Sequence, residues 1–159
     1  MIFVTVGASR PFDRLVREID KIASETEYDF IAQIGNGTYI PRYVKYFRFK
    51  PLEEILKLMK KSDLIISHGG FGSILYSALC QRPIICVPKT FELDVTDNDQ
   101  TELVKYFDQK GILKGVYDLN KLREAIQDIK FQPHDIEINY HISEQIGAFI
   151  EKYFSGERK

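Results

Sequence analysis

A single stretch of the chain combines an apolar run, a histidine and closely spaced glycines. Residues 63–73 read DLIISHGGFGS, and three of the chain's ten glycines fall within four positions of this segment. A strand that turns into a helix through glycines leaves the first N–H groups of the helix free, at the positive end of the helix dipole. Because glycine also lets an anionic group approach the backbone closely, the segment predicts a diphosphate-binding turn.

Two side chains beside this turn carry hydrogen-bond donors. Ser73 supplies a hydroxyl, and His68 supplies an imidazole at the end of the expected strand. Each has a simpler alternative: Ser73 caps its helix, and His68 bonds a nearby carbonyl, in a turn whose glycines only satisfy backbone geometry. The segment is neither a P-loop, which requires Gly-Lys-Ser/Thr, nor the G-x-G-x-x-G dinucleotide motif.

Two further loops place polar groups after expected strands. Gly7 and Arg10 follow the first expected strand, and Asp97, Asp99 and Gln100 lie at the expected start of a helix. A carboxylate accepts hydrogen bonds from hydroxyl groups, and an amide both donates and accepts them. The alternatives are that the two aspartates only favour the helix dipole and that Arg10 is a solvated charge.

The apolar pattern predicts strands that alternate with helices. Apolar, β-branched runs bounded by glycine or proline are typical of buried strands, and apolar residues at three- and four-residue spacing are typical of amphipathic helices. This alternation predicts an α/β fold, a parallel sheet with helices on both faces, whose strand ends bring the three loops together at one edge. Strands are expected at residues 2–6, 30–34, 46–49, 64–66 and 83–87, with a weak one at 112–116, and helices at 11–22, 51–61, 74–81, 97–110, 120–129 and 142–154.

Length and composition fit one ordinary globular domain. The chain has 159 residues, of which 44% are hydrophobic and 28% charged. We therefore expect a single domain over residues 1–159, with a C-terminal amphipathic helix at about 140–154. The formal net charge of −1 excludes nucleic-acid binding that rests on a large basic field.

The sequence also carries expectations about the cellular setting. Cys80 and Cys86 lie in apolar segments without metal-ligand spacing, so we expect two small core residues in a reducing, cytoplasmic environment. The first residues lack the charged lead of a signal peptide, and no apolar stretch approaches the ~20 residues of a membrane helix. Membrane association is therefore expected only through a partner or a surface.

Four motifs, in order along the chain, resemble the glycosyltransferase family 28 C-terminal domain. They are IFVTVG at 2–7 followed by PFD at 11–13, IAQIG at 31–35, SDLIISHGGFGS at 62–73 and NDQ at 98–100. The likeness covers residues 1 to about 115, and it is strongest to the free-standing donor-binding subunits of two-subunit transferases. Those subunits serve N-acetylglucosamine transfer in asparagine-linked glycosylation, and galactose or glucose transfer in bacterial exopolysaccharide synthesis.

The resemblance implies a Rossmann-like domain, equivalent to the C-terminal half of a GT-B enzyme, that holds a uridine diphosphate (UDP) sugar. Tyr76 stands where larger relatives carry a ribose-binding glutamate, and Gln81 stands where many carry glycine. The implied contacts are to the diphosphate from Gly7, Ser9, His68, Gly69, Gly70, Gly72 and Ser73, to the sugar from Asn98, Asp99 and Gln100, and to the uracil or ribose from the vicinity of Phe49 and Tyr76.

The resemblance covers only one half of such an enzyme. Inverting transfer needs a base that takes the proton of the acceptor hydroxyl, and the resemblance places that base on a partner. It implies a glycosyltransferase subunit, inactive alone, that adds a hexose or N-acetylhexosamine to a lipid-linked acceptor beside a membrane-anchored partner, peripheral at the cytoplasmic membrane face. No catalytic residue, metal or cofactor is expected in this chain. The alternatives are a non-catalytic nucleotide-sugar-binding or regulatory module and a relative of nucleotide-sugar 2-epimerases.

Overall fold

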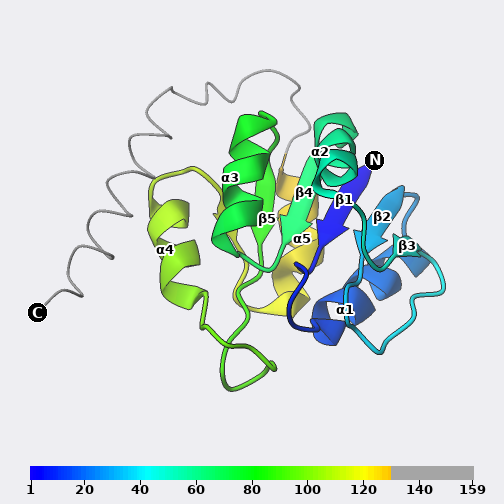
Figure 1. The fold of residues 1–159 in the computed structure, drawn as a ribbon, viewed down its shortest axis with the longest axis horizontal. Helices are drawn as coiled ribbons and strands as arrows, with labels where there is room; N and C mark the ends of the chain where they lie inside the picture. Colours follow the sequence, from blue (N-terminus) through cyan, green and yellow to red (C-terminus); the bar gives the residue numbers. More distant parts are fainter. Residues whose placement is uncertain (130–159) are drawn as a thin grey trace, which may run out of the picture.

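Within residues 1–129, which the computed structural model describes, six parallel strands form one sheet in the order β3-β2-β1-β4-β5-β6 (Figure 1). The order reverses between β1 and β4, and open α/β sheets leave a ligand crevice at the carboxyl ends of the strands at such a point. The strands are β1 (Ile2–Thr5), β2 (Phe30–Gln33), β3 (Lys45–Phe47), β4 (Leu64–Ser67), β5 (Ile84–Cys86) and β6 (Lys114–Gly115).

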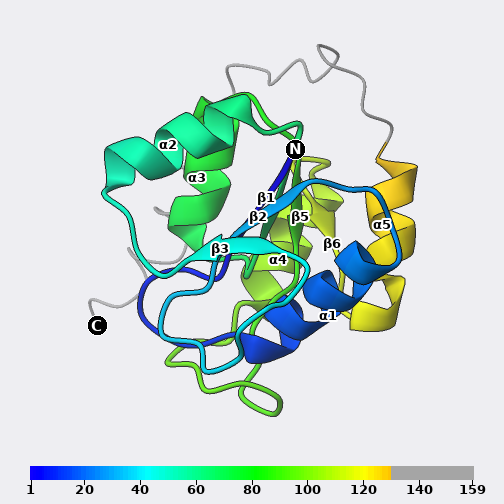
Figure 2. The same cartoon turned by 90° about the vertical axis from the view of Figure 1, so that its right-hand side faces the viewer.

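Helices cover both faces of this sheet (Figure 2). One face packs against α1 and α5, and the other packs against α2, α3 and α4. This arrangement confirms the expected α/β fold, a Rossmann-like parallel sheet. The helices are α1 (Asp13–Ser24), α2 (Leu52–Lys61), α3 (Phe71–Leu79), α4 (Thr101–Gln109) and α5 (Leu122–Asp128), with a short 3-10 turn, η1 (Leu119–Lys121), before α5.

Successive strand side chains alternate between the two faces of the sheet. Both faces are apolar because helices cover both of them. In β1, Ile2 and Val4 belong to the core under α1 and α5, and Phe3 between them belongs to the core under the other three helices. These three residues are at most 2% exposed. Strands β1 and β4 pair with Thr5 opposite Ser67, so the loops after these strands leave the sheet side by side.

Helix α3 is displaced toward the glycines relative to the expected range of 74–81. It starts at Phe71, directly after Gly69 and Gly70 and with Gly72 as its second residue, because the N–H groups of Ser73 and Ile74 donate to the Gly70 carbonyl at 3.0 and 3.2 Å. Gln81, expected within the helix, has a φ of +53°, the left-handed conformation in which helices commonly end.

Helix α4 begins later than expected, at Thr101 instead of Asp97. Asp97 accepts two hydrogen bonds from Arg10, at 2.9 and 2.6 Å, which hold it in the loop. The Asp99 carboxylate accepts the Thr101 N–H at 2.8 Å, as polar side chains do where helices start. Asp97 therefore makes a long-range contact and Asp99 a local one, and neither lies in the first turn of α4.

Cys80 and Cys86 are buried free thiols, which confirms their expected place in the core. Burial raises the pKa of both thiols, so neither is a reactive thiolate at neutral pH. Among residues 1–129, no helix combines the length and apolarity needed to cross a bilayer. The C-terminal helix expected at about 140–154 lies outside the described residues.

Candidate functional site

The turn between β4 and α3 presents free hydrogen-bond donors. The first helical bonds are donated by Ser73 and Ile74, so the N–H groups of Phe71 and Gly72 precede them and lack a partner inside the helix. Ser73 is the third residue of α3 and makes no capping hydrogen bond, and no group within residues 1–129 bonds its hydroxyl. Two N–H groups and a hydroxyl at the positive end of a helix suit an anionic ligand.

The imidazole ring of His68 lies against two glycines that are distant in sequence. A Cβ atom on Gly7 would lie 2.8 Å from Cε1 of His68, and one on Gly70 would lie 2.4 Å from Nε2. Both distances are too short for a side chain, so these glycines leave the space that the ring fills. Gly72 differs, because a Cβ atom there would meet nothing closer than Tyr76, at 3.9 Å. Of these glycines, Gly72 is the one whose surface is open to a ligand.

His68 is neutral at physiological pH. Burial and, to a smaller extent, the charge of Lys89 lower the pKa of this imidazole, a hydrogen bond with the Thr5 backbone opposes them, and the resulting pKa is about 4. Nδ1 lies 3.4 Å from the Ser67 hydroxyl. A neutral imidazole has one N–H group, so His68 offers a ligand no positive charge, and this N–H can serve the Thr5 backbone or a ligand but not both at once.

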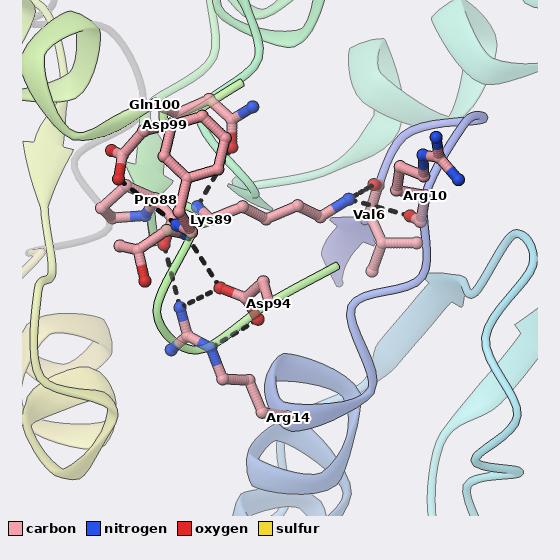
Figure 3. A network of polar contacts seen from close by, with 10 residues as sticks. Val6, Arg10, Arg14, Pro88, Lys89, Asp94, Asp99 and Gln100 are labelled. Atoms are coloured by element: carbon pink, nitrogen blue, oxygen red, sulfur yellow. Dashed lines mark hydrogen bonds and ion pairs between the residues drawn. The ribbon is translucent and has the colours of Figure 1, made fainter. Parts of the chain in front are cut away.

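Lys89 is a buried residue that the sequence pattern did not indicate as functional. It is 2% exposed and reaches from the loop after β5 to the loop after β1 (Figure 3). Its ammonium donates to the carbonyl groups of Val6 and Arg10, at 3.1 and 2.8 Å. Burial lowers the pKa of Lys89 to about 8, while Asp94 acts in the opposite direction. The ammonium thus joins two of the three loops expected to form the site.

Gln100 joins α4 to the same lysine. Its side-chain oxygen accepts the Lys89 N–H at 3.1 Å, and its backbone N–H donates to the Lys89 carbonyl at 3.0 Å (Figure 3). The Gln100 amide also donates to the Asn98 carbonyl at 2.7 Å. A sugar hydroxyl would share or replace these bonds, so the role of Gln100 in sugar binding stays a prediction.

Asp99 is exposed, and its carboxylate is hydrogen-bonded within its own loop. It accepts the N–H groups of Thr101 at 2.8 Å and of Phe91 at 3.4 Å. Hydrogen bonding from Thr101 lowers the pKa of this carboxyl, so it is ionised at neutral pH. An ionised carboxylate accepts several hydrogen bonds at once, so Asp99 keeps the capacity to accept from a sugar hydroxyl.

Two ion pairs fasten the loop 89–100 to the first loop and to α1. Arg10 pairs with Asp97 at the surface, so it is not the freely solvated charge of the simpler alternative. Arg14 binds both oxygens of Asp94 at 2.8 Å and also donates to the Pro88 carbonyl at 2.9 Å (Figure 3). The Asp94 side chain is only 4% exposed, so this second pair is largely shielded from water.

The remaining predicted residues extend the site along the carboxyl edge of the sheet. A Cβ atom on Gly69 would lie 3.8 Å from Cβ of Gln100, which places the turn after β4 beside the start of α4. On the other side, a Cβ atom on Gly35 would lie 2.9 Å from the Gly7 carbonyl and 3.9 Å from the ring of Phe49. Phe49, 51% exposed, and Gln100 therefore mark the two ends of one continuous row of loops.

Ser9 lies in the first of these loops. Its carbonyl accepts a hydrogen bond from the Asn36 amide at 3.2 Å, and no group within residues 1–129 bonds its hydroxyl. Tyr76 lies one turn after Gly72 on α3, near the open side of the turn. Among residues 1–129, no three histidine, cysteine, aspartate or glutamate side chains are grouped to hold a metal ion. Independence of a metal stays a prediction.

Known proteins share this fold and parts of this sequence. ALG13 of Homo sapiens, a UDP-N-acetylglucosamine transferase subunit, is 31% identical over an alignment of 125 residues, and the match covers 70% of this chain and 10% of the human protein. The chain thus spans about a tenth of the length of that curated relative.

Two solved structures show the same architecture. CalG4, the calicheamicin glycosyltransferase, has a TM-score of 0.61 at 14% identity, over 95% of this chain and 43% of its own. The NMR solution structure of ALG13 has a TM-score of 0.54 at 20% identity, over 79% of this chain and 83% of its own. At these identities the likeness is one of fold, that of GT-B glycosyltransferases.

A family model adds the sequence evidence that these structural likenesses lack. The glycosyltransferase family 28 C-terminal domain matches residues 1–151, a range that includes every residue of the site described above. The likeness first indicated by four short motifs thus extends over nearly the whole chain. On this evidence the chain belongs to the glycosyltransferase family 28 C-terminal domain family.

Proposed function

We propose that this chain is the donor-binding subunit of an inverting glycosyltransferase. It binds a UDP-sugar and, with a membrane-anchored partner that holds a lipid-linked acceptor, adds a hexose or N-acetylhexosamine to that acceptor. One observation carries the proposal: the free N–H groups of Phe71 and Gly72 and the unbonded Ser73 hydroxyl lie at the start of α3, beside a neutral His68. The human relative is a UDP-N-acetylglucosamine transferase subunit, which supports uridine diphosphate as the carrier.

The chemistry of this half-site is stabilisation of the leaving group. As the sugar departs, negative charge builds on the diphosphate, and donors already aimed at that position stabilise it without reorganisation. The acceptor hydroxyl must also lose a proton to a base. His68 packs against Gly7 and Gly70, and we assign it to the diphosphate, so we assign the base to the partner. The chain alone is then inactive.

Titration with UDP tests the donor half of the proposal. We expect a Kd on the order of micromolar to millimolar, since one half of a site contributes. Amide NMR signals of Gly70, Gly72 and Ser73 should shift, and Ser73→Ala should weaken binding while Ser24→Ala, at the far end of α1, should not. Shifts confined to other surfaces, or none at millimolar UDP, would contradict the proposal.

A transfer assay tests the catalytic half. The purified chain, a candidate membrane subunit encoded beside it and a lipid-linked acceptor are combined with several UDP-sugars. Transfer should need both subunits. UDP-sugar binding without transfer by any such pair would favour the non-catalytic binding module, and transfer by the single chain at the rate of the pair would show that the site is not shared.

A further inference from the structure

The loop between β5 and α4 exposes three large apolar side chains close together. Phe91, Leu93 and Val95 are 64%, 65% and 65% exposed, and they alternate with Glu92 and Asp94. The loop extends past the carboxyl edge of the sheet, at the bottom of Figure 1. Single exposed apolar residues are common on proteins, but a cluster of them marks an interaction surface.

The contacts of Asp94 hold this loop in place. Its carboxylate is 4% exposed, pairs with Arg14 and accepts the Thr90 N–H at 3.0 Å (Figure 3). The Asp94 N–H donates to the Thr90 carbonyl at 3.0 Å, which closes a turn. The acidic side chain therefore points into the molecule while its apolar neighbours point out. An anchored turn of this kind presents apolar groups at little further entropic cost when a partner covers them.

The charge of this loop favours a protein over a membrane as the surface that covers the three apolar side chains. Arg10 and Arg14 are already paired with Asp97 and Asp94, so the exposed carboxylates of Glu92 and Asp99 leave the loop negative. Anionic lipid surfaces attract basic segments and repel acidic ones. A second copy of this chain would bring the same negative loop against itself, which like charges disfavour.

We propose that Phe91, Leu93 and Val95 insert into an apolar socket with a basic rim on a partner protein. The inference rests on the proposed function, and it identifies that protein with the acceptor-binding subunit. The loop lies directly before residues 98–100, where the sugar of the donor is expected. An acceptor hydroxyl must approach the sugar from this side, so a subunit that carries the acceptor reaches this loop first.

The main test compares two sets of equally exposed residues. The triple variant Phe91→Ser/Leu93→Ser/Val95→Ser should bind the candidate acceptor subunit at least tenfold more weakly than the wild-type chain, by surface-based affinity measurement. The control variant Tyr43→Ser/Leu79→Ser removes side chains that are 66% and 68% exposed elsewhere, and should bind within twofold of wild type. Equal affinity of all three proteins would overturn the inference.

Two further measurements keep the test decisive if the triple variant folds poorly. A photoreactive phenylalanine analogue in place of Leu93 should cross-link to the acceptor subunit, whereas the same analogue in place of Leu79 should not. Glu92→Lys should slow association with that subunit, most strongly at low salt, because a basic rim would then repel the loop. Absence of both effects would overturn the inference.

Other occupants would show themselves in the isolated chain. Binding to vesicles of phosphatidylcholine and phosphatidylserine, or dimerisation in light scattering, that the triple variant abolishes would reassign the loop to a membrane or to a second copy. UDP binding at the donor site separates a failure of this inference from a failure of the proposed function. If UDP binds and the pair transfers sugar although the loop variant behaves as wild type, only this inference fails; if wild type does not bind UDP, the proposed function fails.

Discussion

Nε2 of His68 occupies the place that a side chain on Gly70 would need, since a Cβ atom there would lie only 2.4 Å away. Gly7 approaches the same end of the ring, where a Cβ atom would lie 2.8 Å from Cε1. These glycines are therefore required by the histidine, whether or not an anion is bound. The ring in turn lies next to the free donors at the start of α3, so its position affects how those donors meet a ligand.

Replacement of Gly70 by alanine should displace the His68 ring. The ring end is a side chain rather than backbone, so it can move outward, and the main effect should be on the site rather than on folding. Once the ring is less buried, we expect the pKa of His68 to rise from about 4 toward 6.5, and UDP affinity to fall about tenfold. NMR titration of the imidazole signals measures the first effect.

Gly72→Ala is the matched control for this variant, because its added methyl group would have no neighbour closer than 3.9 Å. It should leave the His68 titration unchanged. A His68 pKa that stays near 4 in Gly70→Ala would mean that the glycine does not fix the ring.

The low pKa of His68 makes folding stability depend on pH. Below pH 6.5 the unfolded chain takes up a proton at this residue, while the folded chain stays neutral down to about pH 4. The contribution of His68 to the free energy of unfolding is therefore fully present above pH 6.5 and is lost as the pH falls toward 4. The total loss is about 3 kcal/mol.

The pH dependence should be measured as a difference between two proteins. The free energy of unfolding of wild type, measured relative to that of His68→Gln in urea titrations at several pH values, should fall by about 3 kcal/mol between pH 6.5 and 4. Parallel curves over this range would show that His68 titrates alike in the folded and unfolded chains.

The order of strands and helices could be predicted because its signals are local. Each strand is a short apolar run, and each helix shows its own periodicity. The start of α4 was not predictable in this way, because Asp97 is held by Arg10, which lies 87 residues earlier in the chain. Gly69 and Gly70 were correctly placed in a turn, whereas Gly72 lies in α3, and the glycine spacing cannot reveal that Gly7 and Gly70 both approach one imidazole ring.

Lys89 shows the same limit more strongly. A lysine in a polar loop has the pattern of a solvated charge, yet its partners are the carbonyl groups of Val6 and Arg10, 83 and 79 residues away. The one local signal was its position three residues after the end of the buried strand β5, at Cys86. Long-range contacts of a single side chain produce no periodic pattern of residue types, so they can be identified only in the folded structure.

Lys89→Met should destabilise the fold and loosen the site. The substitution keeps most of the apolar stem but leaves the Val6 and Arg10 carbonyl groups without their donor, which costs about 1–3 kcal/mol. Urea denaturation measures this loss. Lys105→Met, which removes an exposed lysine paired within α4, should cost less than about 0.5 kcal/mol. Equal stability of both variants would show that the buried ammonium contributes nothing to stability.

Gln100→Ala should separate sugar recognition from diphosphate recognition. In the proposed function Gln100 faces the sugar, so the KM for the UDP-sugar in the assembled enzyme should rise about tenfold, the loss of roughly one hydrogen bond. The inhibition constant of UDP, which lacks the sugar, should change less than twofold. Ser73→Ala provides the contrast, because a residue that contacts the diphosphate should weaken both ligands alike.

A purely structural role for Gln100 predicts a different pattern. Its side chain accepts the Lys89 N–H and donates to the Asn98 carbonyl, so its loss could also loosen the loop. Gln100→Glu decides between the two roles, since the carboxylate still accepts the Lys89 N–H but cannot donate to Asn98 or to a sugar oxygen. If the amide donor serves the sugar, Gln100→Glu should raise the KM for the UDP-sugar as Gln100→Ala does, while the UDP inhibition constant stays at the wild-type value and the unfolding free energy falls only by the lost Asn98 bond, about 1 kcal/mol. Parallel losses of UDP affinity and stability in both variants would assign Gln100 to the loop alone.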